Sequence, residues 1–333
     1  MGPYIKSKKS INTSIINIII SLIPIIIYSI IKIGIIPYTK GDKNVLFYPL
    51  LIILITTICM YIFDTIYSFI FKKKDIKKIL NENKSIYPAL LLALLIPIKT
   101  PLLLIILATF ISSTVKMISN KINFRINGVV VGTLITLIIL KVMGIYTNSF
   151  EVMGTYENLV KPYGNITKMI IGIPKETLGE VSTLLCSIGF IFLTLMKSIK
   201  WRIPLTYLLT IFGVTYVIGG MNDLGLWYPI YQVIAGGLVF TGIFVISDNQ
   251  TTPTTPIGQI LFGIFTGILT VIFTYLLPLH VGALLSIILM NLFVPIIDKI
   301  GTYARFNFKV TIIPFVIAWL LILILSIVLS IKL

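Results

Sequence analysis

The sequence predicts an all-α, polytopic membrane protein with 10–11 transmembrane helices. Of its 333 residues, 57% are hydrophobic and only 11% are charged, and the mean hydropathy is +1.05. Soluble domains carry about 25% charged residues, so this chain cannot build a water-facing surface. Apolar blocks recur along its length, and several reach the roughly 20 residues that a helix needs to cross a bilayer.

The charge distribution agrees with this class. The formal net charge is +16, from 27 Lys and Arg against 11 Asp and Glu. In a soluble protein this excess would suggest nucleic acid, but here the basic residues lie in short loops between apolar runs. Cytoplasmic loops of membrane proteins carry such an excess, and anionic lipid is their nearest partner. We therefore expect a lipid bilayer and no nucleic acid.

Eleven apolar segments can be delimited from the sequence. The first is interpreted as a retained helix, since no small-residue cleavage site follows it. In chain order the segments are Ile11–Ile36, Val45–Phe71, Ile86–Ile98, Leu102–Val115, Ile126–Tyr146, Val181–Met196, Ile203–Gly220, Tyr228–Ser247, Ile257–Leu277, Leu279–Ile297 and Val310–Ile331.

The third and fourth segments are short and separated by Lys99-Thr100-Pro101. Basic residues flank the pair on both sides, so the chain must cross the membrane an even number of times between them if positive loops share one side. Two short helices turning at Pro97–Pro101 satisfy this requirement, whereas one kinked span does not. Short, proline-interrupted segments also mark functional regions in transporters.

The charges predict a cytoplasmic N-terminus in the cell membrane. With that orientation, 18 of the 27 basic residues fall on the cytoplasmic side, as the positive-inside rule requires. The group of segments one to five then begins on the inside, and the group of segments six to ten begins on the outside. This permits a five-plus-five inverted repeat followed by an extra C-terminal helix.

The most polar short stretch is Asp248–Pro256, nine consecutive non-apolar residues between two spans. Thr254 or Thr255 can cap the next helix, with Pro256 in its first turn. The same stretch also suits a ligand or a partner.

Several stretches together resemble the D subunit of the Rnf ion-translocating electron-transport complexes, which is related to the B subunit of the sodium-translocating NADH:quinone reductase. The similarity covers about residues 3 to 300. Phe244–Asp248 with Thr254–Gly263 resembles the signature of this subunit. Pro3–Lys8 also matches in order, and four further stretches are specific together: Ala89–Leu94 with Pro97, Leu178-Gly179-Glu180-Val181-Ser182, Trp201-Arg202-Ile203-Pro204 and Asn291–Asp298. The resemblance implies a membrane domain like that of the Rnf D subunit over 1–309, and an extra transmembrane helix over 310–333 that common family members lack.

The resemblance also implies a function. Such complexes couple electron flow, typically from ferredoxin to NAD or a quinone-like acceptor, to pumping of Na⁺ or H⁺. The D subunit carries FMN, joined by a phosphoester to a threonine in the outer loop before the sixth helix. The partners would be other membrane subunits and subunits with iron–sulfur clusters and flavin. The chain alone would catalyse nothing, because it has no soluble domain for NAD or ferredoxin.

By position, Thr167 is the expected FMN attachment residue. The family motif reads Asp, two residues, then Ser-Gly-Ala-Thr, whereas this chain has Lys161 in place of the Asp and Gly164-Asn165-Ile166 before the threonine. Thr167 is therefore equally interpreted as an ordinary loop residue or as part of a glycosylation sequon. A second departure is Ile118–Gly128, where the family has a glycine-rich turn and Asn-Pro-Ala.

Intramembrane ionisable residues are the remaining candidates, because each is costly in lipid. Asp64 lies near the inner end of the second segment, where it serves an ion path, pairs helices or reaches toward water. Glu180 starts the sixth segment and is the other ion-path candidate, while His280 is expected at the interface. No catalytic dyad, metal cluster or nucleotide-binding glycine motif stands out. Rival functions are a flavin-free secondary transporter or permease, and a structural membrane subunit.

Overall fold

The computed structural model describes residues 11–39, 47–72, 84–122, 125–145, 170–171, 177–234, 237–303 and 308–330. These residues form a bundle of helices, with no strand among them beyond an isolated β-bridge. Six helices are long and apolar enough to cross a membrane, and a seventh span is formed if one bent pair is counted. The chain is therefore a multi-pass, all-α membrane protein, as the composition predicts.

The helices follow the predicted segments closely. The first span is α1 (Ile11–Ser29), continued by the π-helix η1 (Ile30–Ile35) and α2 (Ile36–Thr39). The other helices of the first half are α3 (Tyr48–Lys72), α5 (Ile86–Leu95), α6 (Leu102–Ile122) and α7 (Gly128–Val142). The second half contains η3 (Leu178–Glu180), α10 (Thr183–Leu195), α11 (Arg202–Met221), α12 (Trp227–Ile234), α13 (Leu238–Phe240), η5 (Thr241–Val245), α14 (Pro256–Leu276), α15 (Leu279–Tyr303) and α16 (Phe308–Ser330).

Two segments differ from the prediction. The fourth is not short, because α6 continues past Val115 to Ile122 and carries Lys116 within it. The eighth is not a straight span, since Trp227–Ile234 and Leu238–Val245 are bent by 64° relative to each other. Gly237 precedes the second part with φ +68°, a left-handed conformation that glycine adopts without steric cost.

The same helix pairs pack together in both halves of the chain. In the first half α3 contacts α5 and α6, and α6 contacts α7; in the second half α11 contacts α12 and α14, and α14 contacts α15. The first helices of the two halves, α1 and α10, contact each other. The third segment is interrupted in each half, after Leu95 and before Leu238. An internal repeat requires this arrangement.

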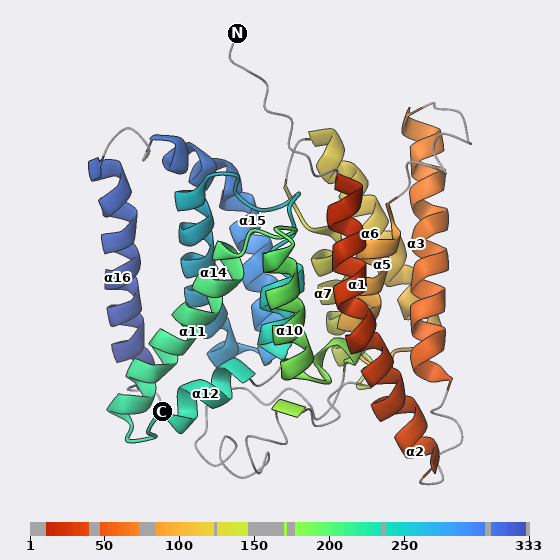
Figure 1. The fold of residues 1–333 in the computed structure, drawn as a ribbon, viewed down its shortest axis with the longest axis horizontal. Coiled ribbons are helices and arrows are strands. Elements are labelled where there is room, and N and C mark those ends of the chain that lie inside the picture. The colour runs from red at the N-terminus through yellow and green to blue at the C-terminus, as the bar shows by residue number, and fades with distance from the viewer. Residues whose placement is uncertain are drawn as a thin grey trace.

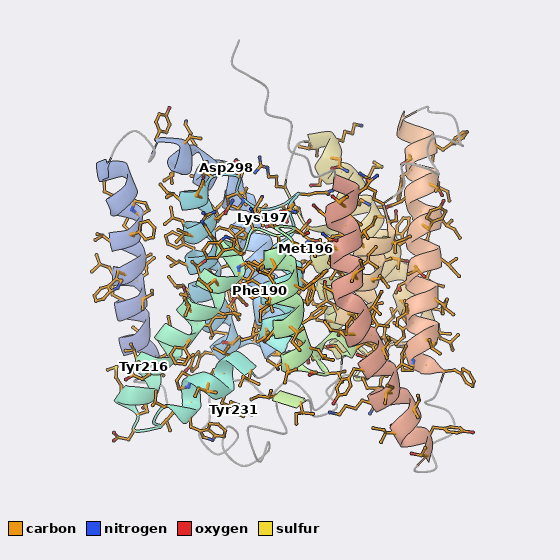
Figure 2. The ribbon with its side chains drawn as sticks, viewed as in Figure 1. Phe190, Met196, Lys197, Tyr216, Tyr231 and Asp298 are labelled. Atoms are coloured by element: carbon orange, nitrogen blue, oxygen red, sulfur yellow. The ribbon has the colours of Figure 1, made fainter. Side chains whose placement is uncertain are left out.

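The two ends of the bundle differ in chemistry (Figures 1 and 2). Lys197 and Asp298 lie toward the upper end in the view of Figure 2, whereas Tyr216 and Tyr231 lie toward the lower end. We call the first end the basic end, because the helix ends and connections there carry Lys84, Lys121, Arg125, Lys197, Lys200 and Lys299. Helices alternate in direction between the two ends.

Apolar side chains cover most of the outer surface. α16 illustrates this, since Trp319 is 67% exposed and Ile324 is 59% exposed, while Ala318 is buried. A surface of this kind is stable only in lipid, where no hydrophobic penalty acts on it. α16 packs against α11, α14 and α15.

Candidate functional site

The two interrupted segments meet inside the bundle around the short segment Thr177–Glu180. α5 ends at Leu95, and the extended Pro97 forms an antiparallel β-bridge with Thr177. A Cβ on Gly179 would lie 3.0 Å from the Leu94 carbonyl oxygen and 2.9 Å from the Phe240 ring. Thr177–Glu180 is therefore held between the C-terminal end of α5 and the start of α13. We call these residues, Leu94–Pro97, Thr177–Glu180 and Gly237–Phe240 together with His280, the junction.

Polar contacts fix the junction to its surroundings. Ser29, in α1, donates its hydroxyl to the Leu178 carbonyl at 2.5 Å. The Tyr48 hydroxyl donates to the Thr100 carbonyl at 2.7 Å, and the Thr100 hydroxyl donates to the Pro97 carbonyl at 2.7 Å. These bonds satisfy carbonyls of the non-helical backbone that follows α5 and of the short segment packed against it.

Glu180 and His280 are in direct contact at the junction. The side chain of Glu180 is 3% exposed and that of His280 is 11% exposed, and His280 Nε2 contacts Glu180 Oε1. Gly237 makes room for this carboxylate, because an added Cβ would collide with Glu180 Oε1 and Cγ. The sequence predicts His280 at the interface, but its imidazole is directed inward to a buried acid.

Asp64 is paired with a base. Its Oδ2 accepts a hydrogen bond from Lys116 Nζ at 2.6 Å and another from the Ser85 hydroxyl, just before α5. Its side chain is 11% exposed, and that of Lys116 is 31% exposed. Asp64 thus ties α3 to α6 and to the start of α5. It lies near the basic end, away from Glu180.

Asp298 forms a third acid–base pair, which is half-buried. Its Oδ2 accepts from Arg125 at 2.6 Å, and its Oδ1 accepts from the Thr254 backbone N–H at 2.7 Å and from the Thr254 hydroxyl at 3.1 Å. This carboxylate therefore joins α15, the α6–α7 connection and the polar segment before α14. These bonds fix Thr254, within the polar stretch Asp248–Pro256, to α15.

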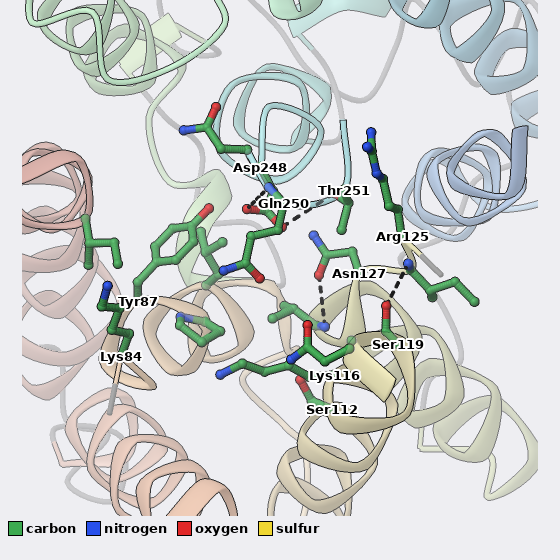
Figure 3. A pocket seen from close by; sticks show the side chains of 18 of the residues that line it. Lys84, Tyr87, Ser112, Lys116, Ser119, Arg125, Asn127, Asp248, Gln250 and Thr251 are labelled. Carbon is green, nitrogen blue, oxygen red and sulfur yellow. Dashed lines mark hydrogen bonds between the residues drawn. The ribbon is translucent and has the colours of Figure 1, made fainter. Parts of the chain in front are cut away.

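A polar cavity of about 450 Å³ opens at the basic end (Figure 3). Helices α1, α5 and α6, the start of α7 and the polar stretch before α14 line it. Its principal polar side chains are Lys84, Tyr87, Lys116, Arg125, Asn127, Asp248, Gln250 and Thr251. The departure from the family pattern at Ile118–Gly128 lines the same cavity, including Ser119, Asn120 and Gly128.

Asp248 is the acid on the wall of this cavity. Its carboxylate accepts only long bonds, from the Gln250 N–H and from the Thr251 hydroxyl, both at 3.4 Å. Burial raises the pKa of Asp248 above its ordinary value, and the Gln250 N–H and the Lys200 ammonium oppose that rise. Burial lowers the pKa of Lys200, while Asp248 and Asp298 act to raise it.

Thr167 lies outside the described residues. The nearest described residues are Ile170 and Ile171, whose carbonyls accept from the Ser182 hydroxyl at 3.3 Å and from the Tyr28 hydroxyl at 2.9 Å. Lys32 lies beside Tyr28, with its ammonium 5.3 Å from the ring centroid. A cation and an aromatic ring therefore lie beside the described residue Ile171.

Comparison with known proteins decides the family. A model of the NQR2, RnfD, RnfE family matches residues 1–307. The chain belongs to this family.

Curated relatives carry the names of components of complexes. The chain is 33% identical over 177 residues to the D subunit of the proton-translocating ferredoxin:NAD(+) oxidoreductase complex of Clostridium ljungdahlii, covering 53% of this chain and 51% of the relative. It is 34% identical over 122 residues to the Na(+)-translocating counterpart of Acetobacterium woodii, covering 37% of this chain and 36% of the relative. It is 31% identical over 160 residues to the B subunit of the Na(+)-translocating NADH-quinone reductase of Chlamydia pneumoniae, covering 40% of this chain and 31% of the relative. The chain thus spans about half or less of the length of these relatives.

Within the family fold, the structure brings together residues that the sequence left separate. Glu180 meets His280, and Asp64 meets Lys116. No signal in the sequence indicated either pair, because the partners lie in different spans. Among the described residues, no group of three or more His, Cys, Asp or Glu is placed to hold a metal ion.

Proposed function

We propose that this chain is a membrane subunit of an Rnf-type, ion-translocating oxidoreductase complex. Family membership and the junction support the proposal. Two interrupted segments that meet at a buried carboxylate are typical of ion and substrate sites in secondary transporters, where irregular backbone lines the path. Glu180 is the residue of this chain that we assign to the ion path.

Asp64 is assigned a different role. Its carboxylate is neutralised by Lys116 at 2.6 Å and lies near the basic end. Removing one partner of such a pair would leave an uncompensated charge in a region of low dielectric constant. We therefore assign Asp64 to pairing α3 with α6, rather than to ion transport.

Electron transfer in the complex would depend on partner subunits. The helices of this chain leave no soluble domain among the described residues for NAD or ferredoxin. Partners with iron–sulfur clusters and flavin would supply the redox centres, and other membrane subunits would complete the ion path. We place the basic end on the cytoplasmic side of the cell membrane, because its loops carry most of the Lys and Arg.

We propose FMN as the cofactor that this chain carries, on Thr167. The described residues nearest to Thr167 in the sequence are Ile170 and Ile171; the Ile171 carbonyl accepts from Tyr28, and Lys32 lies beside Tyr28. An ammonium beside an aromatic ring suits a phosphate-bearing ring system. The polar cavity lies at the basic end, which is the opposite end of the bundle from Tyr28 and Lys32. The flavin would supply the conversion between electron pairs and single electrons.

The FMN proposal is tested by fluorescence of the denatured chain in a gel. The chain is produced together with its own flavin transferase, with Thr167→Ala as the variant and Thr155→Ala as a control in the same loop. We expect a fluorescent parent and control and a dark Thr167→Ala band. A dark parent would exclude covalent flavin, and a fluorescent Thr167→Ala band would move it to another residue.

A flavin-free secondary transporter is the second candidate, because the junction supports it equally. Such a protein would take up its substrate when the purified chain alone is placed in liposomes. The complex subunit would show ion uptake only with its partners and only during electron transfer. If neither preparation takes up an ion, a structural membrane subunit remains.

A further inference from the structure

The Glu180–His280 pair differs in kind from the other two acid–base pairs, which are half-buried. Asp64 is paired with Lys116, and Asp298 is paired with Arg125. Lysine and arginine stay protonated across the physiological range, with ordinary pKa values of about 10.4 and above 12. Histidine exchanges its proton near neutral pH. Among the acid–base pairs that the described residues form, the junction therefore holds one that can exchange a proton under physiological conditions.

The position of the pair suits an exchange with water. His280 starts α15, at the end of the bundle opposite the basic end, and its side chain is more exposed than that of Glu180, at 11% against 3%. Glu180 lies behind it, against Gly237 and between the two interrupted segments. A proton that arrives from the junction reaches Glu180 first, and a proton that leaves to water passes His280.

The surrounding titratable groups do not compete with this exchange. On the elements packed around the pair they include Cys186 on α10, Tyr228 and Tyr231 on α12, Tyr275 on α14, Tyr28 and Lys32 of the first span, and Lys141 on α7, while Tyr87 on α5 and Asp298 and Lys299 on α15 lie toward the basic end. Cysteine, tyrosine and lysine keep their protonation state near pH 7. A change in the charge of the junction near neutral pH is therefore a change in the protonation of the pair.

The same contact disfavours a sodium ion. Hard cations are bound by several oxygen ligands around one point. Here an imidazole nitrogen contacts the Glu180 carboxylate. A metal cation bound to that oxygen would have to displace the imidazole, whereas a proton can be held between the two side chains.

We propose that the Glu180–His280 pair binds and releases the transported ion, and that this ion is H⁺. This inference rests on the proposed role in ion transport. The loaded pair is a carboxylate with an imidazolium, of net charge zero. Release of the proton from the imidazole leaves a carboxylate with a neutral imidazole, of net charge −1.

The test uses vesicles that contain the whole complex, with reduced ferredoxin and NAD⁺ supplied. Internal acidification is followed with a pH-sensitive dye, and sodium uptake is followed with ²²Na⁺. We expect acidification that a protonophore abolishes and a sodium ionophore leaves unchanged. Uptake of ²²Na⁺ that survives the protonophore would overturn the inference and leave the proposed function standing. Electron transfer without uptake of either ion would contradict the proposed function itself.

Variants assign the effect to the pair. We expect His280→Gln to lower proton uptake per NAD⁺ reduced at least about ten-fold and to flatten its dependence on pH. The double variant Glu180→Gln with His280→Gln keeps an uncharged, hydrogen-bonded pair and controls for folding; it is expected to show the same loss. Ser286→Ala, a buried substitution on the same helix, should behave as the parent. Unchanged proton uptake and pH profile in both pair variants would overturn the assignment.

Discussion

At the scale of single residues, the buried carboxylate of Asp248 lowers the stability of the folded protein when it is ionised. Burial raises its pKa, so the folded protein binds the Asp248 proton more tightly than the unfolded chain does. Stability is then greatest below the ordinary pKa of aspartate and falls as pH rises through the raised value. The 3.4 Å bonds from Gln250 and Thr251 and the more distant Lys200 and Lys116 oppose this loss.

Asp248→Asn should therefore stabilise the protein at neutral pH. The amide oxygen of asparagine can still accept from the Gln250 N–H, and its NH2 group replaces the oxygen that accepts from the Thr251 hydroxyl. The amide carries no charge to desolvate. We expect the unfolding temperature in detergent to rise on the order of 1–3 °C at pH 7.5, and to change little at pH 4. The measurement is the fraction of monodisperse protein after heating. A lower unfolding temperature at pH 7.5 would show that the charge of Asp248 stabilises the fold.

Asp298→Asn is the matched control, since it makes the same chemical change at a paired carboxylate. It leaves Arg125 without its partner at 2.6 Å. We expect the unfolding temperature to fall on the order of 2–5 °C at pH 7.5. Opposite signs for the two variants would show that the partner, rather than burial, decides the effect of a carboxylate here.

Residue roles are predictable from the sequence where they depend on near neighbours. The helix cap is an example: Thr255 accepts from the Gly258 N–H at 3.2 Å with Pro256 in the first turn, as the sequence predicts. The inward direction of His280 is not predictable in this way, because its partner is 100 positions away in the chain and only packing joins them. The role of Asp64 stays open at the level of sequence for the same reason.

At the scale of helices, close packing of α11 against α14 depends on small residues. A Cβ on Gly267 would lie 2.9 Å from Thr210 Cβ and 3.1 Å from the Tyr207 carbonyl oxygen. Membrane helices associate through such contacts, since lipid provides no hydrophobic driving force between them. Gly267→Leu should therefore separate the two helices.

The expected loss for Gly267→Leu is about 1–3 kcal/mol, typical of an overpacked interface. Gly213→Leu is the control, because a Cβ at Gly213 meets nothing within 4 Å and leucine favours the helix. Thermal unfolding of both variants in the same detergent measures the difference. Equal stability of the two variants would mean that α11 and α14 do not pack as described.

The locations of helices are predictable because a membrane span needs about 20 apolar residues. The breaks within the helices are less predictable from the sequence than the locations of the helices. The sequence predicts the break after α5 from Pro97 and Pro101, but not the 64° bend before Leu238, since a glycine does not by itself require a left-handed backbone. The sequence also predicts that the fourth segment ends before Lys116. α6 continues past this residue because Asp64 neutralises its charge inside the bundle.

At the scale of the whole molecule, the repeat is visible through packing rather than through residue identity. The pairs α3–α6 and α11–α14 correspond, as do α6–α7 and α14–α15. Hydropathy marks where segments lie but not which segments touch, so the sequence allows a repeat without establishing it. The candidate site follows from this arrangement, because the junction forms where the interrupted third segments of the two halves meet.

Orientation in the membrane provides the last prediction. The described helices alternate in direction, so the α6–α7 connection and the α11–α12 turn lie at opposite ends of the bundle (Figure 1). With Cys59 and Cys186 replaced by Ser, single cysteines are introduced as Lys121→Cys and Asp223→Cys, both at exposed positions. Because the basic end should face the cytoplasm, an impermeant thiol reagent should label the Asp223→Cys variant in intact cells. The Lys121→Cys variant should react only after permeabilisation. The reverse pattern would place the basic end outside, and labelling of both variants in intact cells would contradict the alternation of the helices.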